Sequence, residues 1–126
     1  MKKIITIKNA PEPVGPYSQA ILHRDTLYSS GQIAIDPKTN SLILDSIEKE
    51  THQVMKNLKA ILNEAGLDLK NIVKASIFCK DLGDFSRINE VYGSYFDGNE
   101  PARECVEVAR LPKDVNVEIS VIAEFY

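Results

Sequence analysis

The residues best suited to chemistry lie on two C-terminal segments that have a strand pattern. Arg103 and Cys105 share one face of the first segment, and Glu118 interrupts alternating apolar residues in the second. An arginine can hold a carboxylate through two parallel hydrogen bonds, and a glutamate beside a bound molecule can orient water or move a proton. The same two charges could also form a structural salt bridge, and a polar strand face often simply meets solvent. The residue types therefore indicate a small-carboxylate site without deciding whether it is catalytic.

The two segments are joined by a short turn at residues 111–114. A turn of this kind predicts that the strands on either side pair with each other in antiparallel fashion. Arg103 and Glu118 would then lie close to the same face of a sheet. The short turn thus predicts that Arg103 and Glu118 form a single site on one face of the sheet.

The common catalytic motifs are absent. The sequence contains no G-x-S-x-G, H-E-x-x-H, G-x-x-x-x-G-K-[ST] or G-x-G-x-x-G pattern. His23 and His52 are isolated on different expected elements, and Cys79 and Cys105 form no C-x-x-C pair. We expect two reduced thiols, no metal site and no Cys–His nucleophile pair.

The elements that must position these residues follow from hydrophobic periodicity. The pattern predicts the order β-β-β-α-β-α-β-β, in which the second and third strands form a hairpin. The expected strands are 4–7, 17–23, 26–35, 72–80, 103–110 and 115–125, and the expected helices lie between a cap at Asp45 and a stop at Gly66 and over 84–96. The simplest product is an α+β domain spanning residues 1–126, with a mixed sheet and two helices on one of its faces. The other face contains apolar residues, so a partner subunit could cover it.

Composition excludes several classes of protein. The chain has 126 residues and a formal net charge of −3. No apolar run approaches the roughly 20 residues of a membrane helix, and the N-terminus lacks the apolar region of a signal peptide. We therefore expect a cytoplasmic protein without a membrane partner. The acidic balance argues against a broad nucleic-acid surface.

Several segments resemble the RidA (YjgF-type) family. The stretch 101–119, which reads PARECVEVARLPKDVNVEI, is similar to the C-terminal signature of that family. Residues 10–20, with GPYSQA, resemble its N-terminal segment, and SGQI at 30–33 resembles its third-strand motif. Residues 71–74 and 80–85 are similar to the region that leads into the second helix. The resemblance therefore extends from end to end of the chain.

The resemblance implies a chorismate-mutase-like fold and a homotrimer, in which the three sheets form a barrel with three pockets between subunits. The implied activity is the hydrolytic deamination of reactive 2-imino acids and their enamines. The chief substrates would be 2-iminobutanoate and 2-iminopropanoate, and the products would be 2-oxo acids and ammonium. This reaction would need neither a metal nor a cofactor.

The resemblance also implies roles for individual residues. Arg103 matches the arginine that holds the substrate carboxylate, and Glu118 matches the acid that positions the attacking water. Five further positions match residues that line the pocket: Tyr17, Ser30, Gly31, Asn89 and Cys105. Residues 97–100 form a shorter loop than in the best-known members, and this loop is expected near the mouth of the pocket, where it would affect the range of substrates.

Two other functions compete with the deaminase. A non-catalytic module could use the same Arg103 pocket to bind 2-oxo acids or other small carboxylates. RNA cleavage or translation inhibition is a label often attached to this family. The charge of −3, the absence of a histidine pair and the lack of an aromatic and basic stripe count against an RNA substrate.

Overall fold

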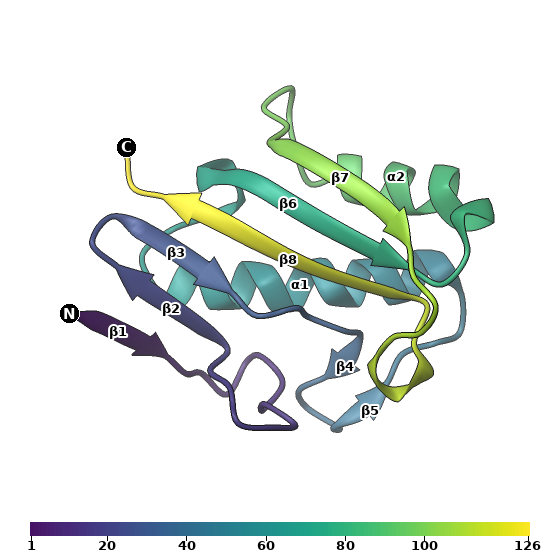
Figure 1. Cartoon of the computed structure of the whole chain (residues 1–126), viewed down its shortest axis with the longest axis horizontal. Helices are drawn as coiled ribbons and strands as arrows, with labels where there is room; N and C mark the ends of the chain where they lie inside the picture. Colours follow the sequence, from purple (N-terminus) through teal and green to yellow (C-terminus); the bar gives the residue numbers. More distant parts are fainter.

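The structure, a computed structural model, describes all residues 1–126 and has one main sheet with two helices on one of its faces (Figure 1). The sheet has six strands in the order β1-β2-β3-β8-β6-β7. Its strands are β1 (Lys2–Ile5), β2 (Ala20–His23), β3 (Thr26–Ser29), β6 (Ile72–Cys79), β7 (Ala102–Glu107) and β8 (Val117–Glu124). The helices are α1 (Ile47–Glu64) and α2 (Phe85–Gly93), and a small hairpin joins β4 (Ile35–Asp36) to β5 (Ser41–Leu42). The predicted α+β class is confirmed, as is the hairpin of β2 and β3.

The core lies between α1 and the central strands. Alternate residues of β8 are fully or almost fully buried on the helix side: Val117, Ile119, Val121 and Ala123. They pack in one cluster with the apolar stripe of α1, which includes Val54, Leu58 and Ile61. Each such side chain contributes about 1.5–3 kcal/mol when it leaves water. This packing anchors β8, the strand that carries Glu118, in the core.

The helix boundaries follow local capping chemistry. Ser46, rather than Asp45, is the N-cap of α1, and its side chain accepts a hydrogen bond of 3.1 Å from the Lys49 N–H. Asp45 instead forms an exposed ion pair with Lys49. Gly66 follows the helix with φ of +82°, as expected for a glycine stop. The second helix is shorter than the predicted 84–96. A 3₁₀ turn at residues 82–84 precedes it, and it ends at Gly93, after which the N–H groups of Tyr95 and Phe96 bond to carbonyls three residues back.

The predicted pairing of the last two strands is wrong. β6 lies between β7 and β8 and pairs in parallel with β7 and antiparallel with β8. The unit β6-α2-β7 places β7 at the edge of the sheet, as Figure 1 shows. Residues 108–116 form a long connection rather than a tight hairpin turn, so they can carry the chain past the end of β6 to β8.

Arg103 and Glu118 lie on opposite faces of the sheet, so the expectation of a shared face is also wrong. Arg103 is opposite Ala75 of β6, whose side chain is buried on the helix side. Glu118 is opposite Phe78 of the same strand. Side chains alternate along a strand, so positions 75 and 78 face in opposite directions. The insertion of β6 thereby separates the two charged residues.

The third strand is shorter than its sequence pattern. β3 ends at Ser29, and the chain rejoins β8 only at Gln32, which exchanges two backbone hydrogen bonds of 2.8 and 3.1 Å with Ile119. Residues 33–35 are buried one after another, so the predicted alternation ends here. This break brings Gly31 against Glu118 on the open face.

The face away from the helices is open and chemically mixed. Tyr28 and Val106 are 49% and 41% exposed there. Lys74 and Glu104 form an ion pair of 2.8 Å, and Ser76 donates a hydrogen bond to the same carboxylate. Neither helix combines the length and the apolar composition that crossing a membrane would require.

Candidate functional site

Arg103 belongs to the edge strand β7, and its side chain reaches helix α2. Its guanidinium carbon is 5.7 Å from the centre of the Phe85 ring and 5.0 Å from the centre of the Tyr92 ring. Each such contact is worth about 0.5–1 kcal/mol when exposed and more when desolvated. Arg103 forms no ion pair and donates no hydrogen bond within the chain. The aromatic rings therefore hold a cation whose hydrogen-bond donors are free.

Two buried polar groups on helix α2 also lack partners. They are the side-chain oxygen of Asn89 and the hydroxyl of Tyr92. Phe85, Asn89 and Tyr92 recur at helical spacing and so lie on one side of α2. Burial raises the pKa of Tyr92 to about 12, although the charge of Arg103 opposes this effect. Tyr92 is therefore a neutral hydroxyl at physiological pH.

Cys105 lies two residues beyond Arg103 on the same face of β7. It is half-buried and opposite Ile77, while Cys79 lies further along β6 on this face and is fully buried. Both thiols are free. Burial, with a smaller effect from Cys105, raises the pKa of Cys79 to about 11. Cys105 is thus the accessible thiol, and we refer to Phe85, Asn89, Tyr92, Arg103 and Cys105 as the Arg103 half-site.

A second group of predicted residues meets on the open face. Tyr17, Ser30, Gly31 and Glu118 line one cavity of about 300 Å³, which we call the Glu118 half-site. Ser30 donates its hydroxyl proton to the Ser18 carbonyl at 2.6 Å. The Tyr17 hydroxyl accepts a hydrogen bond of 3.2 Å from the backbone of Val14. These bonds fix the wall of the cavity and leave the carboxylate as its functional group.

Glu118 packs directly on the backbone of Gly31. A β-carbon at position 31 would lie 2.7 Å from the carboxyl carbon of Glu118 and 2.9 Å from one of its oxygens. Any side chain at position 31 would therefore displace the Glu118 carboxyl group, so glycine serves close approach here rather than a special φ angle. Burial raises the pKa of Glu118 above its ordinary value, and the carboxylate accepts no hydrogen bond within the chain. The group is suited to taking a proton from water.

The structure divides the predicted site residues into two sets. Arg103 and Cys105 lie on the helix side, and Asn89 lies on the side of α2 that carries Phe85 and Tyr92. Tyr17, Ser30, Gly31 and Glu118 lie together on the open side. The sheet separates the sets, so a small ligand bound to one chain cannot contact both Arg103 and Glu118.

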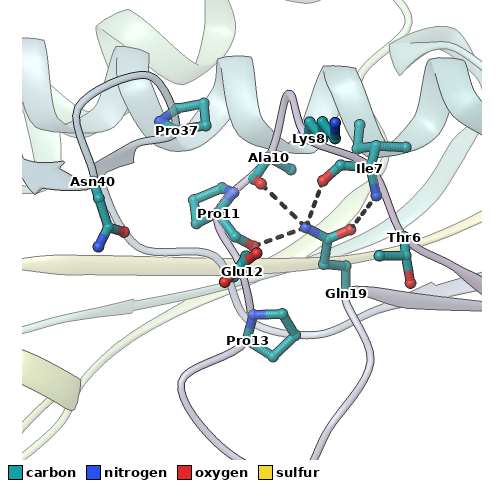
Figure 2. A pocket seen from close by; sticks show the side chains of 10 residues that line it. All are labelled: Thr6, Ile7, Lys8, Ala10, Pro11, Glu12, Pro13, Gln19, Pro37 and Asn40. Atoms are coloured by element: carbon teal, nitrogen blue, oxygen red, sulfur yellow. Dashed lines mark hydrogen bonds between the residues drawn. The ribbon is translucent and has the colours of Figure 1, made fainter.

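A larger cavity, of about 710 Å³, is not this site. It lies beside the N-terminal loop, as Figure 2 shows. The buried Gln19 side chain accepts a hydrogen bond from the Ile7 N–H at 2.8 Å and donates toward the carbonyls of Ile7, Ala10 and Pro11. All its polar atoms are engaged, so Gln19 stabilises the loop and offers nothing to a ligand.

Sequence reasoning missed three residues: Phe85 and Tyr92, whose rings contact Arg103, and Glu50, which is buried on α1. Phe85 and Tyr92 were expected only as part of the second helix, although their spacing relative to Asn89 could have indicated a common surface. Glu50 lies three residues after the buried Ile47 and four before Val54, on the apolar stripe of α1. A carboxylate at such a position is a signal of a buried polar contact.

Comparisons with known proteins agree with this architecture. The family model described as Endoribonuclease L-PSP matches residues 7–125. A RutC family protein of Pyrococcus horikoshii is 50% identical over 123 residues, which cover 98% of each chain. The 2-iminobutanoate/2-iminopropanoate deaminase of Rattus norvegicus is 44% identical over 123 residues, covering 98% of this chain and 90% of that protein. The crystal structure of E. coli TdcF with bound serine has a TM-score of 0.94 and 41% identity, with coverage of 98% and 99%.

Proposed function

Because the chain belongs to the RidA (YjgF-type) family, we propose that it hydrolyses 2-imino acids to 2-oxo acids and ammonium. The proposed substrates are 2-iminobutanoate and 2-iminopropanoate, the compounds in the name of the rat relative. The observation that carries the proposal is the free guanidinium of Arg103. A half-buried arginine held by two aromatic rings, with no acidic partner in its own chain, is suited to a ligand carboxylate. The E. coli neighbour holds serine, which is a carboxylate of comparable size.

In this proposal the carboxylate on Arg103 fixes C2 of the substrate. Glu118 accepts a proton from a water molecule as the water oxygen attacks C2, and a carbinolamine forms. Glu118 returns this proton to the amine nitrogen, the C–N bond breaks and ammonia leaves. The hydroxyl proton of the carbinolamine passes through Glu118 to the departing ammonia, which gives the carbonyl of the 2-oxo acid and ammonium. An iminium acid and one water thus give a 2-oxo acid and ammonium, with no change in oxidation state. Holding the reactants in place can supply several kcal/mol of such a barrier.

The proposal requires two copies of the chain. Arg103 of one subunit would meet Glu118 of the next subunit across an interface. The two half-sites are different surfaces, and a contact between different surfaces closes into a ring when the rotation permits. The family resemblance suggests that this ring is a homotrimer. The exposed Tyr28 and Val106 on the open face support burial of that face by a neighbour.

Simple binding of 2-oxo acids is the alternative that the same arginine favours. Glu118 distinguishes the two functions, because a half-buried acid near an anionic ligand weakens binding, so its presence favours catalysis. Glu118→Gln should therefore abolish turnover and preserve 2-oxo acid binding. The word endoribonuclease in the family description finds no support in His23 and His52, which lie on β2 and α1.

A coupled assay tests the proposal. A threonine dehydratase generates 2-iminobutanoate in the presence of semicarbazide, which traps the imine as a semicarbazone. The wild-type protein should suppress semicarbazone formation, and Arg103→Ala should not. No suppression at any protein concentration would exclude deamination of this substrate and favour the binding module.

A further inference from the structure

Glu50 is a buried carboxylate with no cation beside it. It lies near the start of α1 and is 0% exposed. One of its oxygens accepts hydrogen bonds from the backbone N–H groups of Asn116 at 2.8 Å and Val117 at 3.1 Å. The other accepts a bond of 2.8 Å from the Asn116 side-chain amide. All three partner groups are hydrogen-bond donors, so both atoms at the end of the residue 50 side chain act as acceptors.

These bonds satisfy a strand end that would otherwise be unpaired. Beyond Gln32, which pairs with Ile119, the chain diverges from β8, so residue 117 has no strand neighbour on that side. A buried backbone N–H without a partner costs about 1–3 kcal/mol. Glu50 replaces the missing strand and connects α1 to the first residues of β8.

Glu118 is the next residue along the chain. The residue before it, Val117, is hydrogen-bonded to Glu50, and the residue after it, Ile119, is hydrogen-bonded to Gln32. The backbone of Glu118 is therefore held by both of its chain neighbours. Its side chain meets the backbone of Gly31 on the open face. The position of the Glu118 carboxyl group is therefore set by contacts on both faces of the sheet.

We propose that Glu50 is a positioning residue for Glu118, which fixes the backbone that presents the Glu118 carboxylate to the proposed reaction. This inference rests on the proposed function. Glu50 acts here through hydrogen bonds and not through its charge. A glutamine can preserve them, because its oxygen can accept both backbone donors while its amide donates to the oxygen of a flipped Asn116 side chain. Leucine preserves the volume and removes every bond.

The experiment compares Glu50→Leu, Glu50→Gln and Thr51→Val in the imine assay and in binding of 2-oxobutanoate. Thr51 is the matched control: it is also fully buried on α1, and its hydroxyl bonds only to the Ile47 carbonyl of the same helix. Glu50→Leu should lower kcat at least about tenfold, because a misplacement of about 1 Å can cost about 100-fold. Binding of 2-oxobutanoate at Arg103 should be unchanged. Glu50→Gln should restore most of kcat, and Thr51→Val should leave kcat at the wild-type value.

A second readout does not depend on activity. In Glu50→Leu, the amide of Val117 should lose protection from hydrogen exchange. The Glu118 carboxyl should titrate closer to an ordinary glutamate in carbon-detected NMR, because it leaves its half-buried place on Gly31. If wild type fails in the imine assay but these changes occur, the proposed function is wrong and the positional coupling stands.

Three results would overturn the inference. In the first, Glu50→Leu exposes the Val117 amide but keeps the wild-type kcat and the wild-type titration of Glu118. Glu50 would then have a purely structural role. Another is a loss in Glu50→Gln as large as in Glu50→Leu, which would assign the effect to charge. If Glu50→Leu does not fold, Asn116→Ala removes one of the three bonds. It should lower kcat by a smaller factor, and a wild-type kcat with a wild-type Glu118 titration would overturn the inference.

Discussion

Arg103 and Glu118 project from opposite faces of one sheet, because both are set by their register with β6. Neither forms an ion pair within the chain. The molecule therefore presents an unmatched cation beside its helices and an unmatched acid on its open face. Two copies, and not one, are needed to bring these groups to the same small molecule.

Mixed oligomers test this arrangement directly. Arg103→Ala and Glu118→Gln should each be inactive, whereas a mixture refolded together should regain activity. With random assembly, about a quarter of the interfaces would combine an intact Arg103 with an intact Glu118 from the neighbouring subunit. The control mixes wild type with the double variant under the same conditions. An inactive mixture that native mass spectrometry shows to be heteromeric would exclude a shared site.

The raised pKa of Glu118 predicts the direction of a stability change with pH. A carboxyl whose folded pKa exceeds its unfolded value stabilises the fold below the unfolded pKa, and this contribution is lost as pH rises through the folded pKa. Glutamine cannot ionise, so the Tm of Glu118→Gln relative to the wild-type Tm should rise as the pH increases from below the ordinary glutamate pKa to neutral. Thermal unfolding across that range measures the difference. A constant offset in Tm would show that the pKa of Glu118 is unshifted.

Gly31→Ala should damage the site more than the fold. The added methyl group would lie within 3.0 Å of three Glu118 atoms, so the carboxylate must move from the cavity wall. We expect imine hydrolysis to fall about 100-fold, with Tm reduced by a few degrees. Gly93→Ala is the control, since nothing lies within 4 Å of the added methyl group there. It should leave activity intact and stabilise α2 by up to about 1 kcal/mol. Equal activity in the two variants would contradict the contact.

Phe85→Leu should weaken carboxylate binding without unfolding the chain. The ring contacts the Arg103 guanidinium at 5.7 Å, and its loss should cost about 0.5–1 kcal/mol, or a factor of about 2–5 in Kd. Phe125→Leu provides the comparison. Phe125 is 42% exposed and Phe85 is 40% exposed, but Phe125 lies near Gly66 rather than near Arg103. Calorimetric titration with 2-oxobutanoate should separate the two. A matching Kd in both variants would mean that the aromatic contact does not organise Arg103.

The sequence predicts local structure well and long-range pairing poorly. The stripe of α1, the Gly66 stop and the alternation of β8 are properties of neighbouring residues, so they could be predicted. The sequence of strand, helix and strand predicts a crossover through α2, as found, but the local pattern leaves open which strand lies between β7 and β8. It also leaves open the Phe85 and Tyr92 contacts with Arg103, and the hydrogen bonds from residues 116 and 117 to Glu50. The candidate residues were identified by type, but their division between two faces required the register.

The open face with its exposed Tyr28 and Val106 has a consequence for how the protein would be controlled. If the site forms only where this face meets a neighbour, assembly and catalysis share one equilibrium, and specific activity depends on protein concentration. Dilution below the dissociation constant of the assembly would inactivate most sites, although each chain would stay folded and unmodified. The abundance of the protein, rather than a separate effector, would then set both the number of active sites and the fraction that works.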